Sequence, residues 1–320
     1  MPDIGVAIVS FNTRELLRAC LDSLRACGLP LRVVVVDNVS TDGSAAMVRS
    51  CFPEVELIDA GRNLGFAGGT NVALQHLLSR VEEGSATSPP QPDYLLLLNP
   101  DTVVHRGAIE ALAAFLDAHP RTAAVGPRLL NPDGTTQPAA FRFPTLLMTA
   151  LDLFPPGEVL PGRLYGSWWH GRYPQERGEA PFPIDHPLGA CILTRPEVVA
   201  QVGALDDGYF MYAEEVDWCM RVRRAGWAIW QVPSARVTHV GGAATSQLRA
   251  RMLVALYASR LRFFRAHYTP PLAGWHARII RAGALRMTLL AWRDYAAARL
   301  TRDELHARLW AWAEIMKRAG

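Results

Sequence analysis

Two apolar segments of this sequence end in polar side chains of the types that bind nucleotides and divalent cations. The segment VVVVDNVSTDGS places Asp37 and Ser40 after a run of valines, and LLLLNPD places Asn99 and Asp101 after a run of leucines. In an open α/β sheet, ligands bind beyond the carboxyl ends of the strands. A carboxylate such as Asp101 can hold Mg²⁺ on a diphosphate, because Mg²⁺ takes one or two carboxylates plus phosphate oxygens. Plain strand-ending turns use the same residue types and remain an alternative for each segment alone.

Three carboxylates crowd the segment MYAEEVDWCMRVRRAG, and this crowding suits a general base. Like charges this close raise the pKa of at least one carboxylate unless a metal ion or an arginine compensates. The candidates are Glu214, Glu215 and Asp217, with Tyr212 beside them on the substrate side. A solvated helix with ion pairs four residues apart, such as Asp217 with Arg221, is the structural alternative.

Two further features sit near predicted strand ends. His239 precedes two glycines and is a candidate metal ligand, although a single histidine is more often structural. The glycine-rich segment GRNLGFAGGTN, residues 61–71, does not have the spacing of a dinucleotide fingerprint. Its backbone can still approach a nucleotide closely, because glycine carries no side chain.

The elements that must position these residues alternate between short β-branched runs and amphipathic segments. This alternation predicts an α/β fold with a mainly parallel sheet covered by helices. We expect the glycine-rich segment to be a loop, followed by a helix ending near Arg80, and a pair of strands around Ile229 and Val237. Residues 82–92 read as a surface linker, and residues 127–187 as a loop-rich insertion over a substrate site, with Trp168 and Trp169 as substrate-side candidates.

Composition excludes several classes of protein. The single lysine, Lys317, leaves no phosphate-loop or Schiff-base lysine where one would be needed. The five cysteines form no CxxC pair, which argues against a zinc cluster and a disulfide framework and indicates reduced thiols in the cytosol. Neither a secretory signal nor a membrane-spanning run is recognisable, so we expect a cytoplasmic protein.

The region from position 245 onward is basic and predicted to be helical, with a break at Pro270 and Pro271. It holds fourteen Lys and Arg against four Asp and Glu, a balance of +10. Apolar and cationic residues alternate at helical spacing there, which suits an anionic membrane surface. Helices that pack on the catalytic domain or on another subunit of a homo-oligomer explain the pattern equally well. No nucleic-acid reading motif accompanies the charge, so nucleic-acid binding is not expected.

Taken together, six motifs closely resemble bacterial glycosyltransferase family 2, particularly its rhamnosyltransferase-like branch. They are, in order, VSFNTRELLRACLDSL, VVDNVSTDGS, NLGFAGGTN, LLLLNPD, YAEEVDWCMRVRRAGW and THVGG, and they span roughly Ile4 to Tyr268. The resemblance implies a GT-A type fold. Its catalytic domain would cover residues 1–244, with a nucleotide-binding half at 1–126 and an acceptor-side half at 127–244, and a helical extension would cover 245–320.

The resemblance also assigns roles to matching residues. Asp101 would hold Mg²⁺ or Mn²⁺ on the donor diphosphate, with His239 completing the metal site, and Glu215 would be the catalytic base. Asn99 and Glu215 stand where relatives more often carry aspartate. Asp37 would hydrogen-bond the pyrimidine base, uracil or thymine. The remaining nucleotide-site residues implied are Ser10, Phe11, Asn12, Ser40, Asn63, Gly65, Asn71 and Asn99.

The function implied by the resemblance is inverting transfer of a sugar from a dTDP- or UDP-sugar, with L-rhamnose favoured. The acceptor would be a glycan or a lipid-linked saccharide in cell-surface polysaccharide synthesis, at the inner face of the plasma membrane. Two alternatives remain: a catalytically degenerate scaffold that binds nucleotide sugars, and a sugar nucleotidyltransferase. The second lacks support because no glycine-rich loop with basic residues lies near the N-terminus.

Overall fold

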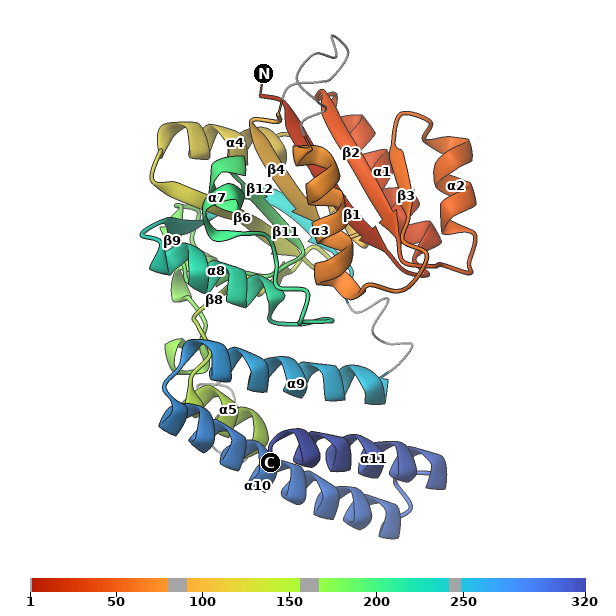
Figure 1. The fold of residues 1–320 in the computed structure, drawn as a ribbon, viewed down its shortest axis with the longest axis vertical. Helices are drawn as coiled ribbons and strands as arrows, with labels where there is room; N and C mark the ends of the chain where they lie inside the picture. Colours follow the sequence, from red (N-terminus) through yellow and green to blue (C-terminus); the bar gives the residue numbers. More distant parts are fainter. Residues whose placement is uncertain (1, 80–90, 156–166, 242–248) are drawn as a thin grey trace. The chain divides into compact units, whose positions relative to one another are not determined.

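The computed structural model describes residues 2–79, 91–155, 167–241 and 249–320 (Figure 1). Contacts divide the chain into two compact units. The first comprises Met1–Phe141, Gln175–Gly208 and Glu215–Ala244, and the second comprises Arg142–Pro174, Tyr209–Glu214 and Thr245–Gly320. This grouping differs from the expected boundary near position 244, because parts of the expected insertion join the C-terminal helices. The expected linker lies outside the described residues as far as position 90.

The first unit is built on one mixed sheet with the strand order β3-β2-β1-β4-β11-β6-β12-β5. Strands β1, β2, β3 and β4 are mutually parallel where they pair, whereas β11 runs antiparallel to both β4 and β6. The strand bounds are β1 (Ile4–Ser10), β2 (Leu31–Asp37), β3 (Glu56–Asp59), β4 (Tyr94–Leu98), β5 (Thr102–Val104), β6 (Thr122–Leu130), β11 (Cys191–Thr194) and β12 (Ala228–His239). Two short strands, β7 (Thr136–Gln137) and β9 (Phe182–Pro183), pair with β6 and β12, while β8 (Ala140–Phe141) pairs with β10 (His186–Pro187).

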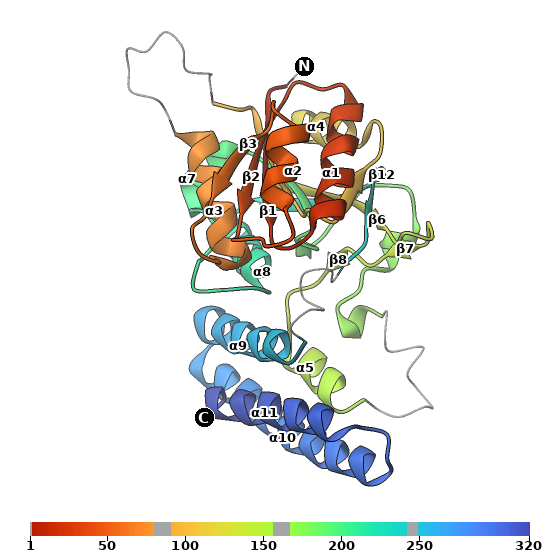
Figure 2. The ribbon, with the colours of Figure 1, turned by 90° about the vertical axis from the view of Figure 1, so that its right-hand side faces the viewer.

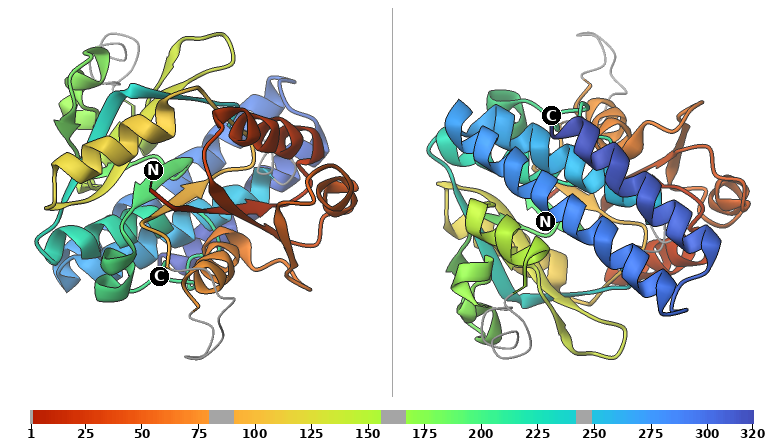
Figure 3. Two further views of the ribbon diagram at one scale, coloured as in Figure 1. Left: turned by 90° about the horizontal axis from the view of Figure 1, so that it is seen from above. Right: turned by 90° about the horizontal axis from the view of Figure 1, so that it is seen from below.

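Helices cover both faces of this sheet (Figures 2 and 3). Helices α1 (Arg14–Cys27) and α4 (Ala108–Ala118) lie on one face, and α3 (Gly65–Leu78), α7 (Pro196–Val202) and α8 (Glu214–Arg224) lie on the other. Helix α2 (Ser44–Cys51) packs beside α1. Successive strand residues point to opposite faces, so Val6 and Ile8 join the core with α1, while Val9 meets α3. The GT-A type α/β fold is therefore confirmed, with one antiparallel strand inside its sheet.

Two expectations about local structure are wrong. Most of the glycine-rich segment is helix rather than loop, because α3 begins at Gly65. Its glycines allow close packing: a Cβ on Gly69 would lie 2.8 Å from Val9 Cγ1. The expected strand pair is the single strand β12, whose pairing with β6 shifts register between Val232 and Arg236. Pro233 falls in that shift, and the break in the apolar pattern there imitates a turn.

The second unit is helical, as the sequence predicts for the region after position 245. It consists of α5 (Leu146–Leu153), the short helix η1 (Trp168–His170), α9 (Arg249–His267), α10 (Pro270–Ala296) and α11 (Arg302–Arg318). Leu153 packs against α10 where Gly283 leaves room, since a Cβ on Gly283 would lie 2.6 Å from Leu153 Cδ1. The buried core of the unit consists of Leu153, Val254, Tyr257, Leu261, Ile280, Ala284, Ala311, Trp312, Ile315 and Ala319. Among the described helices, none combines the length and apolar character needed to cross a bilayer.

Candidate active site

One end of the sheet carries the residues expected to bind a nucleotide. Ser10 and Asp37 are the last residues of the paired strands β1 and β2 and lie opposite each other in register. Asp37 is 4% exposed, and its Oδ2 accepts a hydrogen bond from the Ser40 N–H at 2.9 Å. Its Oδ1 is buried and has no hydrogen-bond partner within the described chain. A buried acceptor without a partner is costly, so this atom suits an N–H donor from a ligand.

The loops that follow β1 and β2 are tied together through Asn12. Its backbone is left-handed, with a φ of 51°, and its Oδ1 accepts a hydrogen bond from the Thr41 N–H at 2.7 Å. Its own N–H donates to Ser40 Oγ at 3.0 Å. Ser10 is fully buried, and half-buried Phe11 lies between it and Asn12. Asn12 and Ser40 therefore shape one rim of the site around Asp37.

The start of α3 forms a neighbouring rim. The Asn38 side chain donates to the Gly65 carbonyl at 2.9 Å, and Asn63 Oδ1 accepts from the Gly65 N–H at 2.9 Å. Gly65 has a φ of 72°, a conformation that glycine adopts without strain. Asn71 lies further along α3, where its side chain binds the backbone of Leu205. Its amide donates to the Leu205 carbonyl at 2.7 Å and accepts from the Leu205 N–H at 3.0 Å. Both the nitrogen and the oxygen of the Asn71 amide thus fasten the chain after α7, and its nucleotide-binding role remains a prediction.

Asp101 and His239 are brought together by strand pairing. Strand β5 begins directly after Asp101 and runs antiparallel to β12, which sets Thr102 opposite His239. His239 Nε2 lies 3.3 Å from Asp101 Oδ1. The N–H of Gly241 donates to Asp101 Oδ2 at 3.1 Å and fixes that carboxylate. Both side chains are largely buried.

Gln137 fixes the orientation of the His239 ring. Its Oε1 lies 2.7 Å from His239 Nδ1, so with the proton on Nδ1 the histidine donates and its Nε2 keeps a lone pair facing Asp101. This arrangement fits a divalent cation held by one carboxylate oxygen and one imidazole nitrogen. No group of three or more metal-binding side chains occurs among the described residues, so phosphate oxygens would have to complete such a site.

Asn99 connects the turn before β5 to the chain that leads into β11. Its N–H donates to the Ala190 carbonyl at 2.9 Å, and its own carbonyl accepts from the Thr102 hydroxyl at 2.7 Å. Gly189 precedes Ala190, and a Cβ there would lie 3.4 Å from the Glu215 carboxyl carbon. Glu215 therefore lies beside the strand that flanks the Asn99–Asp101 turn.

Glu215 is a carboxyl group of the site whose pKa is raised. Burial raises its pKa, and hydrogen bonds from the backbone N–H groups of Glu215, Val216 and Gly189 offset part of that rise. These amides come from the first turn of α8 and from the chain before β11. Two successive residues with left-handed backbone, Tyr212 and Ala213, lead into this helix, with φ of 70° and 65°. Such backbone strain is typical of functional sites.

The other acidic and aromatic candidates have different surroundings. Asp217 is buried and pairs with Arg221 at 2.9 Å, and Arg221 also donates to the Val202 and Ala204 carbonyls. This ion pair, four residues apart, holds the end of α7, and a substrate-side role for Asp217 remains a prediction. Tyr212 and Glu214 belong to the second unit, where Glu214 is buried. Trp168 and Trp169 are exposed in the same unit, and the Arg142 guanidinium lies 4.0 Å from the centre of the Trp168 ring.

Three residues at the site carried no signal that sequence patterns could detect. Gln137 orients His239, Gly189 contacts Glu215, and Gly241 holds Asp101. Of the three, Gly241 could most easily have been selected from the sequence, because it lies two positions after His239 in the motif THVGG. Gln137 and Gly189 act only through strand pairings that join distant parts of the chain.

Comparison with known proteins identifies the family of this chain. A sequence model described as Glycosyl transferase family 2 matches residues 5–203. The chain is 33% identical over 277 residues to an N-acetylglucosaminyl-diphospho-decaprenol L-rhamnosyltransferase of Mycobacterium tuberculosis, covering 85% of this chain and 86% of the relative. It is 23% identical over 241 residues to the rhamnosyltransferase WbbL of Escherichia coli, covering 74% of this chain and 83% of that protein.

A solved structure shares the fold. The mannosyltransferase PcManGT from Pyrobaculum calidifontis, in complex with GDP-Man and Mn²⁺, superposes with a TM-score of 0.55 at 14% identity, covering 100% of this chain and 88% of that one. The motifs, the sheet and the sequence relatives lead to one conclusion. The chain belongs to glycosyl transferase family 2 and is a glycosyltransferase of its rhamnosyltransferase-like branch.

Proposed function

We propose that this glycosyltransferase transfers a sugar with inversion from a dTDP- or UDP-sugar, using a divalent cation held by Asp101 and His239. The observation that carries the proposal is the position of Glu215. Its carboxyl group, of raised pKa, contacts Gly189 beside the Asn99–Asp101 turn. A base and a cation site would therefore flank the same strand end. Inverting transfer requires this arrangement, because the acceptor oxygen attacks one side of the sugar while the nucleoside diphosphate leaves from the other.

Glu215 would accept the proton of the acceptor hydroxyl as that oxygen attacks the anomeric carbon. Its raised pKa brings its basicity closer to that of a base working near neutral pH. The Gly189 and Val216 N–H groups would hold the carboxylate in position during the transfer. A bound divalent cation would act as a Lewis acid on the leaving diphosphate. Asp101 would orient its carboxylate toward that cation, because the Gly241 N–H holds its second oxygen.

The free acceptor on Asp37 supports a uracil or thymine base. Both carry an N–H at position 3, which could donate to the Asp37 Oδ1 atom that has no partner in the described chain. Rhamnose from dTDP-rhamnose is the favoured donor sugar, because the relatives at 33% and 23% identity are both named as rhamnosyltransferases. The name of the mycobacterial relative gives a diphospho-decaprenol acceptor, so a lipid-linked saccharide on the cytoplasmic face of a membrane is the favoured acceptor here.

A donor panel tests this proposal directly. Release of nucleotide would be measured from dTDP-rhamnose, UDP-galactofuranose, UDP-glucose and UDP-N-acetylglucosamine, each with Mg²⁺, Mn²⁺ or EDTA. We expect release from one donor, lost with EDTA. Glu215→Gln should abolish transfer and keep donor binding, whereas Glu197→Gln, at an exposed position of α7, should keep both. Turnover retained by Glu215→Gln would remove Glu215 as the base. Donor binding without any transfer or release would favour the scaffold alternative.

A further inference from the structure

Helix α10 has one face whose large apolar side chains stay exposed among the described residues. Ile280 and Ala284 belong to the core of the second unit, and Ala291 on the same side of the helix is also buried. On the opposite side lie Trp275, Leu285, Leu289 and Trp292, which are 56%, 55%, 62% and 51% exposed. At 100° per residue these four side chains fall within an arc of about 100°, so they form one continuous stripe. Figure 3 shows α10 from below, alongside α5, α9 and α11.

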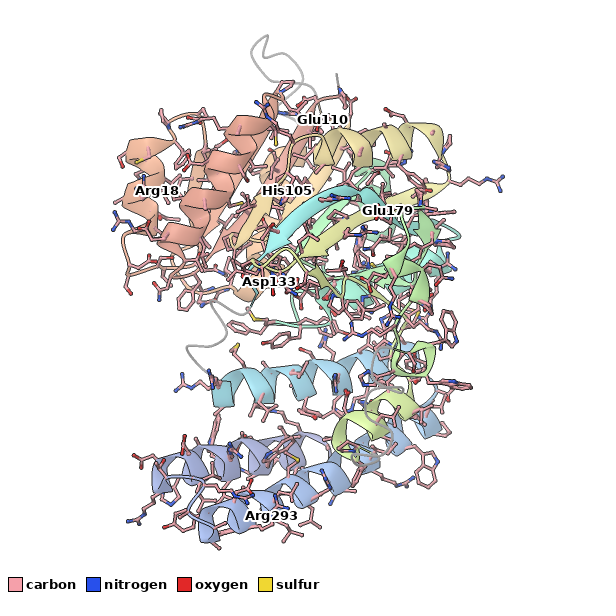
Figure 4. The ribbon with its side chains drawn as sticks, turned by 180° about the vertical axis from the view of Figure 1, so that it is seen from behind. Arg18, His105, Glu110, Asp133, Glu179 and Arg293 are labelled. Carbon is pink, nitrogen blue, oxygen red and sulfur yellow. The ribbon has the colours of Figure 1, made fainter. Side chains whose placement is uncertain are left out.

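Arginines lie within this stripe and at its margins, and acidic residues are almost absent. Arg278, Arg281 and Arg293 are exposed on α10, and the Arg278 guanidinium lies 4.9 Å from the centre of the Trp275 ring. Figure 4 labels Arg293 on this helix. The single carboxylate of α10 is Asp294, which pairs with Arg293 at 2.9 Å. The sequence contains no other Asp or Glu between Asp217 and Asp294.

The tryptophans, leucines and arginines on this side of α10 together match the chemistry of a membrane interface. Tryptophans at both ends of an apolar stripe sit well at the boundary between lipid headgroups and acyl chains. Arginines extend a long apolar stem along such a surface and keep the charge among the headgroups. A stretch without carboxylates attracts anionic headgroups without opposing repulsion. A core-packing role cannot account for the stripe, because these four side chains remain exposed within the folded chain.

We propose that this stripe, namely Trp275, Leu285, Leu289 and Trp292 with Arg278, Arg281 and Arg293, docks the enzyme onto an anionic lipid surface. We call it the α10 face. The proposal deepens the proposed function and rests on it, since a lipid-linked acceptor requires an enzyme that works at a membrane surface. The helix lies flat in the interface, with the rest of the second unit behind it.

The experiment uses the full chain and sedimentation with sucrose-loaded vesicles. One set of vesicles contains phosphatidylcholine alone, and the other contains equal parts of phosphatidylcholine and phosphatidylglycerol. We expect binding to the mixed vesicles, weakened at high salt, and little binding to the neutral ones. The double variant Leu289→Ser/Trp292→Ser and, separately, Arg278→Glu/Arg281→Glu should each reduce binding about ten-fold or more.

Matched controls are available at sites away from the α10 face. Trp310→Ser removes a tryptophan that is 47% exposed on α11, where it lines a hollow with Arg249 and Arg251 of α9. Arg223→Glu reverses an exposed charge on α8 in the first unit. Both should bind mixed vesicles as the parent protein does. Circular dichroism and release of nucleotide from the donor should be unchanged in every variant.

The possible outcomes separate the docking proposal from its alternatives. Binding that survives both double variants would overturn the proposal, as would equal binding to neutral and anionic vesicles. If vesicles are not bound and sedimentation velocity shows a dimer that Leu289→Ser/Trp292→Ser dissociates, the α10 face is an interface between two copies. A protein that binds anionic vesicles through α10 but uses no donor would contradict the proposed function and leave the docking surface standing.

Discussion

His239 Nδ1 lies 2.7 Å from Gln137 Oε1, and its Nε2 lies 3.3 Å from Asp101. The glutamine thereby selects which ring nitrogen faces the aspartate. We expect Gln137→Ala to weaken Mn²⁺ binding about 10- to 100-fold, because hydrogen-bond partners that orient a ligand typically contribute that much. The measurement is titration of Mn²⁺ by electron paramagnetic resonance in the presence of UDP, which needs no turnover.

Gln137→Glu serves as the rescue variant, since a carboxylate can also accept the Nδ1–H and should keep Mn²⁺ affinity near that of the parent. Gln175→Ala, at an exposed position, is the control. Equal Mn²⁺ affinity in Gln137→Ala and the parent would show that the His239 tautomer does not depend on this contact.

Asp37 should determine which bases bind. In the parent, one carboxylate oxygen of Asp37 accepts from the Ser40 N–H and the other is free to accept from a base N–H. Asp37→Asn keeps only one oxygen, which is uncharged, so it cannot serve both donors as the carboxylate does. We expect the affinity for UDP and TDP, measured by calorimetry, to fall about ten-fold or more. CDP has no N–H at ring position 3 and should bind the parent weakly. Asp59→Asn, at the adjacent strand end, where Asp59 pairs with exposed Arg49, should change nothing. Preserved affinity for UDP in Asp37→Asn would remove Asp37 from base recognition.

The raised pKa of Glu215 should also affect the stability of the protein. Its folded-state pKa is raised above the ordinary value of 4.5, chiefly by burial. The unfolded chain loses this proton first as pH rises, so the folded state loses stability from pH 4.5 upward through the folded-state pKa. Glu215→Gln cannot ionise and escapes this loss, so its free energy of unfolding should gain on the parent's by about 1.4 kcal/mol for each pH unit in that window.

Urea unfolding at a series of pH values measures this difference, with Glu197→Gln as the exposed control. A difference between Glu215→Gln and the parent that stays constant with pH would show that the Glu215 pKa does not change on folding.

Close packing of α3 on the sheet should make Gly69 intolerant of a side chain. A Cβ there would meet Val9 Cγ1 at 2.8 Å and Cγ2 at 3.0 Å, so Gly69→Ala should cost about 1–3 kcal/mol of stability. Gly274→Ala is the matched control in α10, where nothing lies within 4 Å of the new atom. There alanine should stabilise the helix by about 0.5–1 kcal/mol. Thermal unfolding followed by circular dichroism compares the two, and similar shifts in both would refute the packing argument.

Sequence patterns predicted the parts of this fold that depend on short-range order. Strands β1, β2 and β4 are apolar runs of strand length, and the polar residues that follow them mark the ligand-binding edge of the sheet. Asp37 and Asp101 could be selected for that reason. The ion pair between Asp217 and Arg221 also follows from helical spacing alone.

Other parts depend on pairings between distant segments. Gln137 reaches His239 only because β7 pairs with β6 and β6 with β12. Asn71 is fastened to Leu205, 134 positions later, and nothing in the glycine-rich segment indicates that partner. The antiparallel direction of β11 was equally hidden, since a short apolar run reads the same in either orientation. These features are fixed by tertiary structure.

The second unit is assembled from three separate stretches of chain, and this division affects how it can be synthesised. Helix α5 leaves the ribosome long before α10, against which Leu153 packs at Gly283. At 5–20 residues per second, the ribosome needs on the order of ten seconds to pass from Leu153 to Gly283, and Leu153 lacks its packing partner for that time. During that interval the nascent chain presents an uncovered apolar segment, a natural target for a chaperone, while the first strands of the sheet can already pair. Slowing translation between positions 153 and 283 should therefore lengthen exposure of α5 and favour aggregation.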